Sequence, residues 1–268
     1  MPSNHALVFK LVMKNLITIL FIFSAFISNA QRTMFGGQNN YVAPVVPFQA
    51  PAIVTTDLLL YLDAENPSSH SGTGNIWYDL STNVNNGTIG TNTIANTSTT
   101  PKKFTFNGTS SNVSFVSSKF NTLYAGKTVI VAAKMDANFG TIRYRALFGN
   151  LSPRNFNLYI YNDGSNYQIH FSAGSWGLSN IVPLVTDQWY VFAATQDANT
   201  IRYYLNGVSV GSTTSAPLQQ YQSSSNEFLG MADNYWYGDI NSAFIYKRCL
   251  SPDEILQNFN ALKSRFCL

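Results

Sequence analysis

The chain has 268 residues, of which 14 % are aromatic and only 11 % are charged, against roughly 25 % charged residues in a typical soluble domain. Asn, Ser and Thr carry the polarity instead and together number 78. The many aromatic residues exclude intrinsic disorder, and the shortage of Glu and Lys excludes a coiled coil. A formal net charge of +3 from scattered Lys and Arg lacks the basic stripe that nucleic-acid binding requires.

The N-terminus has the three parts of a secretory signal peptide. Lys10 and Lys14 flank the start of an apolar run over 16–27, and small residues precede a cleavage point after Ala30. The run has about 12 residues, whereas a membrane anchor needs roughly 20. We therefore expect a signal peptide over 1–30, secretion or display at the cell envelope, and no stable membrane span in the mature chain. Loss of the two lysines leaves a nearly neutral protein.

Residues 31–55 contain Gly and Pro without any period-2 or period-3.6 pattern, which predicts an extended linker. An N-terminal arm that packs on a neighbouring subunit is the alternative. The remaining residues, 56–268, are predicted to form one domain.

Short segments of alternating or β-branched residues follow one another after Asp57. They predict strands at 58–62, 103–107, 113–116, 128–133, 156–161, 167–171, 189–195, 201–205 and 208–211. Turn residues at 108–111 and 162–165 predict hairpins. Asn206-Gly207 is the strongest hairpin signal, because both residues of its turn tolerate positive φ. The succession predicts an all-β sandwich or barrel.

The last element is predicted to be a helix from about Pro252 to Lys263. Ser251 is placed at the N-cap, Pro252 at the first helical position and Glu254 at the third. Ile255, Phe259 and Leu262 recur at helical spacing and give one apolar stripe that can pack on the sandwich.

Seven short motifs occur in a recognisable order: LLYLDA at 59–64, WYDLS at 77–81, NNGT at 85–88, FTFNG at 104–108, YLNGV at 204–208, GDI at 238–240 and IYKRCLSPDEI at 245–255. Together they resemble the laminin-G-like jelly-roll family of the concanavalin A-like lectin/glucanase fold. The resemblance covers about 57–268. It implies an all-β, two-sheet antiparallel jelly-roll sandwich with one short C-terminal helix, sheets of six or seven strands, and the binding of sugars or proteins outside the cytoplasm.

Enzymes of this fold carry their two catalytic carboxyl groups on one strand as Glu-x-Asp-x-x-Glu, since period-2 geometry aims them at one face. The chain has three glutamates, Glu65, Glu227 and Glu254, and that motif is absent. No Gly-x-Ser-x-Gly occurs either. His170 lies mid-strand on the face opposite Ile169, where we expect a solvent-facing side chain. No catalytic residue is therefore assigned, and a non-catalytic binding protein is expected.

The resemblance also suggests a structural calcium site at the rim of the sandwich. Many relatives carry an acidic ligand directly after Gly-x-Ile, but this chain has Asn241 there. The remaining candidate ligands are Asp63, Asp79 and Asp239, since calcium prefers oxygen. Asp79 fits equally well as an acceptor for turn amides.

Cys249 and Cys267 are the two cysteines of the chain, at positions where related chains carry small residues. A paired change, and export to an oxidising compartment, favour a Cys249–Cys267 disulfide. Two free, buried thiols are the alternative.

Sugar-binding sites on such sandwiches combine a stacking aromatic ring with amide and carboxylate groups. Three consecutive aromatic residues follow Asp233 and Asn234, and they cannot all face the core of a strand; we expect Trp236 to be exposed and its two neighbours to be packed. Trp176, between glycines, predicts a second exposed ring on a loop, with Asn155 and Asn157 along the same rim. Trp77 and Trp189 belong to family framework motifs and are predicted to be core residues.

Two functions follow. The first is a secreted lectin-like module that binds a polysaccharide or glycan. The second is a structural or adhesive surface protein that makes protein–protein contacts. The expected partner is a glycan or an extracellular protein in either case, without a required cofactor.

Overall fold

The structure is a computed structural model, and it describes residues 52–116, 120, 124–140, 144–151, 156–172, 176–214 and 226–268, with the backbone alone at 176–178. The predicted signal peptide, most of the predicted linker and Asn155 lie outside these residues. The segment 52–54, predicted as the end of the linker, is tied to the C-terminal helix: Val54 N–H donates to Asn258 Oδ1 (2.9 Å), and Gln257 Nε2 donates to Ala52 O (2.7 Å).

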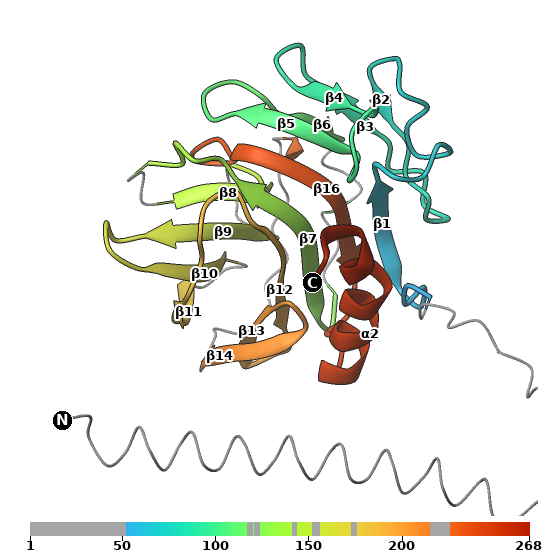
Figure 1. The fold of residues 1–268 in the computed structure, drawn as a ribbon. Coiled ribbons are helices and arrows are strands. Elements are labelled where there is room, and N and C mark those ends of the chain that lie inside the picture. Colours follow the sequence, from blue (N-terminus) through green and yellow to red (C-terminus); the bar gives the residue numbers. More distant parts are fainter. Residues whose placement is uncertain are drawn as a thin grey trace, which may run out of the picture. The chain divides into compact units, whose positions relative to one another are not determined.

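The described strands form two eight-stranded sheets in which neighbouring strands pair antiparallel (Figure 1). Sheet A has the order β14 (Val208–Thr214), β13 (Thr200–Leu205), β12 (Trp189–Gln196), β7 (Lys127–Met135), β16 (Tyr237–Tyr246), β5 (Lys103–Asn107) and β4 (Ile94–Asn96), and β1 (Leu58–Asp63) also pairs with β16. Sheet B has the order β11 (Trp176–Val182), β10 (Tyr167–Ser172), β9 (Asn157–Asn162), β8 (Tyr144–Gly149), β15 (Glu227–Leu229), β6 (Val113–Phe115), β3 (Gly87–Ile89) and β2 (Ile76–Trp77).

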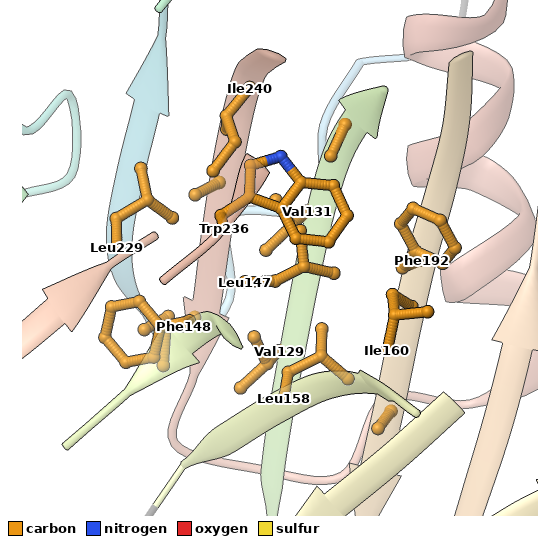
Figure 2. Packing of buried hydrophobic residues seen from close by; sticks show 14 of the residues in the cluster. Val129, Val131, Leu147, Phe148, Leu158, Ile160, Phe192, Leu229, Trp236 and Ile240 are labelled. Carbon is orange, nitrogen blue, oxygen red and sulfur yellow. The ribbon is translucent and has the colours of Figure 1, made fainter. Parts of the chain in front are cut away.

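Period-2 alternation explains how each long strand serves two layers. In β7, Val129 and Val131 belong to the core between the sheets, while Ile130 and Ala132 belong to a second cluster on the outer face of sheet A. Figure 2 shows the first of these layers, with side chains of β7, β8, β9 and β16 meeting in the interior. The predicted jelly-roll sandwich is confirmed, and the described residues form eight strands in each sheet rather than six or seven.

The predicted hairpin between 103–107 and 113–116 is wrong. The two strands exist, but β5 belongs to sheet A and β6 to sheet B. The Asn107 side chain accepts hydrogen bonds from the backbone of Thr109, Ser110 and Ser111 at 2.9–3.1 Å. These bonds wind the turn so that the chain crosses from one sheet to the other instead of reversing within one sheet. The hairpins β9–β10 and β13–β14 form as predicted.

The predicted helix is confirmed as α2 (Pro252–Leu262), which continues as the 3-10 helix η2 (Lys263–Phe266). Ser251 and Glu254 form the predicted capping box. Ile255 and Leu262 are buried against the outer face of sheet A, in the cluster that also holds Phe244 and Tyr246. No helix among the described residues is long and apolar enough to cross a membrane.

The predicted Cys249–Cys267 disulfide is wrong, because both thiols are free in the structure. Cys249 precedes α2, and Cys267 follows η2. An 11-residue α-helix is about 16 Å long at 1.5 Å per residue, and η2 extends it. The two cysteines therefore lie at opposite ends of the helical segment, whereas a disulfide requires Cα atoms within about 7 Å.

Candidate functional site on the outer face of sheet B

Trp236 corrects the central prediction for the binding site. Its side chain is 0 % exposed, and Figure 2 shows the indole within the core next to Ile240 and Val131. Tyr235 and Tyr237 are each partly exposed. Tyr237 packs against the core cluster, as predicted, but the predicted exposure of Trp236 is wrong. Trp236 and Ile240 lie an even number of residues apart, so the buried Ile240 could have set the phase.

Tyrosines gather instead on the outer face of sheet B. Tyr144 of β8 and Tyr161 of β9 are paired in register, and their ring centroids lie 4.9 Å apart. The next row joins Tyr159 of β9 to His170 of β10, with ring centroids 5.4 Å apart. These residues alternate with core residues such as Leu158 and therefore point away from the interior. Tyr144 and Tyr161 remain partly exposed, while Tyr159 is buried.

The loop between β15 and β16 lies over this face. Ala232 packs with Ala146 and Tyr159, and Ala146 N–H donates to Asn234 O (3.3 Å). Asp233 stays exposed, and its Oδ2 accepts a hydrogen bond from Tyr159 Oη (3.2 Å). The loop thus places a carboxylate beside the tyrosine rows.

Buried polar side chains form hydrogen bonds that fix the loop between β15 and β16 and the tyrosine beside it. Asn157 Nδ2 donates to Tyr159 Oη (2.6 Å) and to Asn150 O (2.7 Å). On the other side, Arg145 donates to Tyr235 O (2.9 Å) and to Phe139 O (2.8 Å). Burial lowers the pKa of Arg145. Because these groups are bonded before any ligand arrives, the surface they support is preorganised.

Asp233 and Asn234 are the predicted ligand residues that the structure brings to this face, and Asn157 lies beneath them. Trp176 begins β11 and pairs in register with Ser172, so its backbone is part of a strand and not of the predicted loop; its side chain lies outside the described residues. Tyr144 and Tyr161 were missed. Both residues alternate with core residues along β8 and β9, and this period-2 pattern could have predicted that they lie on the outer face of the sheet.

Two further predictions need correction. His170 does face away from the core, but it is 1 % exposed, because the rings of Tyr144 and Tyr159 lie within 5.4 Å of its own. Trp77 is a core residue as predicted, with 0 % exposure. Trp189 is not in that core: it is half-buried on the outer face of sheet A, where it stacks on Phe266.

The candidate calcium ligand Asp63 is already occupied by a cation of the chain itself. Arg265 donates to both carboxylate oxygens of Asp63 (2.7 and 2.9 Å) and approaches Asn241 Oδ1 (3.4 Å). Asn241 is the position at which the resemblance implies an acidic ligand. A guanidinium therefore binds these oxygens, and the residues do not fit a calcium site.

The other two candidate ligands are committed elsewhere. Asp79 accepts hydrogen bonds from the backbone of Tyr61, Ser81 and Asn85 at 2.8–2.9 Å, as the turn interpretation predicted. Asp239 lies between Lys103 (2.7 Å) and Lys134 (3.2 Å). Within the described part of the chain, no three His, Cys, Asp or Glu side chains come together closely enough to hold a metal ion.

The three glutamates also have structural partners. Glu65 accepts from the backbone of Lys102 (2.7 Å). The hydrogen bond from Arg248 holds the pKa of Glu254 at about 2, while Glu254 caps α2. Glu227 is 0 % exposed, accepts from Asn150 Nδ2 (2.9 Å), and has a pKa raised to about 8 by burial.

Comparison with known families agrees with this architecture. The family model described as the concanavalin A-like lectin/glucanases superfamily matches residues 107–256. The chain belongs to this superfamily. No curated protein matches the sequence.

Solved structures with this fold include sugar-binding and receptor-binding domains. Domain 4 of a GH43 extracellular arabinanase from Geobacillus stearothermophilus, solved with arabinotriose, is 20 % identical (TM-score 0.59; 75 % of this chain and 98 % of that domain). Trypanosoma rangeli sialidase is 15 % identical (TM-score 0.56; 80 % of this chain, 34 % of the sialidase). The botulinum neurotoxin serotype D binding domain is 14 % identical (TM-score 0.59; 79 % and 52 %). At these identities the likeness establishes the fold of this superfamily member and nothing finer.

Proposed function

We propose that this protein is an exported, non-catalytic module that binds a polysaccharide or glycan through the outer face of sheet B. The observation that carries the proposal is the combination of two partly exposed rings, Tyr144 and Tyr161, with the exposed carboxylate of Asp233. Aromatic rings pack against the apolar faces of sugars. Carboxylates accept hydrogen bonds from sugar hydroxyl groups, and amides both accept hydrogen bonds from them and donate hydrogen bonds to them. The arabinotriose-bound domain of the same fold supports this ligand class.

The non-catalytic part of the proposal rests on the glutamates. Glycoside hydrolysis needs a pair of carboxyl groups across the scissile bond. Each glutamate here has a structural partner, and Glu227, the only fully buried one, interacts with Lys127 and accepts a hydrogen bond from Asn150.

Affinity electrophoresis in gels that contain arabinan, xylan, β-glucan or galactomannan tests the proposal. We expect one of these polysaccharides to retard the protein, and Tyr161→Ala to weaken binding about five- to tenfold, the loss of one aromatic contact. Tyr78→Ala is the matched control, since Tyr78 is 51 % exposed and lies outside this surface.

Two results would contradict the proposal. One is equal retardation of wild-type protein and Tyr161→Ala in every gel, together with self-association in solution, which supports a structural or adhesive role instead. The other is release of reducing sugar from the bound polysaccharide, which would make the protein a glycosidase.

A further inference from the structure

A cavity lies on sheet A, away from the tyrosine surface on sheet B. It has a volume of about 410 Å³ and is lined by Asp187, Gln188, Trp189, Tyr190, Asn206, Phe266, Cys267 and Leu268. The start of β12, the turn between β13 and β14, and the end of η2 thus form its walls. Its volume lies in the range of roughly 300–1,000 Å³ that small-molecule sites occupy.

One wall of the cavity is aromatic. The Trp189 indole stacks on the Phe266 ring, with centroids 4.8 Å apart and planes inclined by 22°. Trp189 is half-buried, whereas the other described tryptophan side chains, Trp77 and Trp236, are 0 % exposed. A partly exposed indole that is fixed by stacking is a rigid apolar platform for a ligand ring.

Neutral donors and one carboxylate make up the polar part of the lining. Asn206 Oδ1 accepts from Val191 N–H (2.9 Å), and Gln188 Oε1 accepts from Tyr190 Oη (3.2 Å). Neither side-chain NH₂ donates a hydrogen bond within the described residues, so both remain available to a ligand. The Asp187 side chain is 60 % exposed, and its Oδ1 lies 4.0 Å from Lys134 Nζ. Lys134 is not among the lining residues, which include one acidic side chain and no cationic one. Such a lining disfavours an anion and suits a neutral molecule rich in hydroxyl groups.

The backbone of this cavity is held in an uncommon conformation. Five non-glycine residues of the described chain have positive φ, and three of them, Asp187 (61°), Asn206 (51°) and Cys267 (57°), line the cavity. Asp187 N–H donates to Met135 O (2.8 Å), which fixes the first of them. Asn206 belongs to the Asn-Gly turn of the β13–β14 hairpin and Cys267 caps η2, which accounts for the left-handed backbone of both. Asp187 lies in neither motif, and left-handed backbone at such a residue costs free energy and concentrates at functional sites.

We infer that this cavity is a second saccharide-binding site, which takes a neutral sugar unit against the Trp189–Phe266 stack, with Asp187, Gln188 and Asn206 as hydrogen-bonding groups. The inference rests on the proposed function, since it assigns the same ligand class to a second surface. Trp189 lies on the outer face of sheet A and Tyr161 on the outer face of sheet B. A chain with two such sites cross-links polysaccharide strands and gains avidity from both.

The test combines binding with cross-linking. Asp187→Asn and Gln188→Ala are the variants of choice, because both side chains are exposed and Asn tolerates the left-handed backbone of Asp187. Asp253→Asn, an exposed acid in the first turn of α2, is the control. We expect each cavity variant to bind the retarding polysaccharide about fivefold more weakly, as the loss of one hydrogen bond predicts. We also expect it to lose the ability of wild-type protein to aggregate beads coated with that polysaccharide.

The outcomes separate the two proposals. Wild-type retardation that Tyr161→Ala weakens and that neither cavity variant changes overturns the second site and leaves the proposed function in place. Wild-type protein that none of the four polysaccharides retards overturns both. Bead aggregation that survives in Asp187→Asn and Gln188→Ala also overturns the second site.

Discussion

At the residue scale, the guanidinium of Arg265 binds the oxygens that the sequence suggested as calcium ligands. Its guanidinium binds both oxygens of Asp63, a side chain that is 2 % exposed, and it reaches Asn241. Asn241 alone indicated a lost calcium ligand, but nothing near it in the sequence identified the cation. Arg265 lies 202 positions from Asp63 in the chain, so only the packed fold brings them together.

Arg265→Met should destabilise the protein strongly, because it leaves the buried Asp63 carboxylate without its cation. Breaking a buried ion pair from one side costs about 3–5 kcal/mol, which urea unfolding measures. The control is Arg202→Met, because Arg202 pairs with Asp197 at the surface, where both side chains are 39 % exposed and such pairs contribute about 0–1 kcal/mol. Wild-type protein should melt at the same temperature with and without a chelator. A melting temperature that falls on chelation and recovers with calcium would contradict this account.

Glu227 predicts an unusual pH dependence of stability. Burial raises its pKa to about 8 in the folded protein, and burial lowers the pKa of the neighbouring Lys127 to about 8. The unfolded chain releases the Glu227 proton near pH 4.5, whereas the folded chain keeps it to about pH 8. The contribution of this group is therefore fully present below pH 4.5 and is lost as the pH rises toward 8, by at most about 1.4 kcal/mol per pH unit.

Glu227→Gln removes this titration and should flatten the profile. Relative to wild type, we expect the variant to gain free energy of unfolding steadily from pH 5 to pH 8, measured by urea denaturation at each pH. Glu65→Gln is the control, because Glu65 lies in a turn with only partial burial. Parallel profiles for Glu227→Gln and wild type between pH 5 and pH 8 would show that the Glu227 carboxyl does not titrate in this window.

At the scale of elements, local chemistry predicted the helix and most long strands, but not their partners. The capping box and apolar stripe place α2 within a residue of its observed end, because both signals lie inside the element. The Asn107 turn has the residues of a hairpin loop, yet it joins β5 and β6 across two sheets. Short strands such as β2, β3 and β15, with two or three residues each, carry too little periodicity to be predicted.

The length of the predicted helix was already sufficient to exclude the predicted disulfide. A straight helix that separates Cys249 from Cys267 holds the two thiols apart by its own length. The burial of Trp236 could likewise have been predicted from Ile240, because the two residues lie an even number of positions apart. By contrast, the tyrosine surface depends on the register between β8, β9 and β10, which long-range pairing sets and a single sequence does not reveal.

At the scale of the whole molecule, the outer faces of the two sheets are covered differently. Sheet A is covered on its outer face by α2, through Ile255 and Leu262, while the tyrosine surface lies on the outer face of sheet B. Ile255 of α2 and Tyr161 of β9 belong to different clusters among the described residues, so the effects of substituting them on free energy should add.

Ile255→Ala and Tyr161→Ala should therefore have opposite signatures. Ile255 is 2 % exposed, and its truncation should lower the free energy of unfolding by about 2–5 kcal/mol, with polysaccharide affinity unchanged below the melting transition. Tyr161 is partly exposed, so Tyr161→Ala should weaken affinity and change stability little. Leu256→Ala, at a position 41 % exposed on the same helix, controls for helix propensity. Urea unfolding and affinity electrophoresis of the double variant should return the sum of the two single effects. A loss of affinity in Ile255→Ala would show instead that α2 is coupled to a binding surface, either the tyrosine surface or the sheet A cavity, whose Phe266 belongs to the same cluster as Ile255.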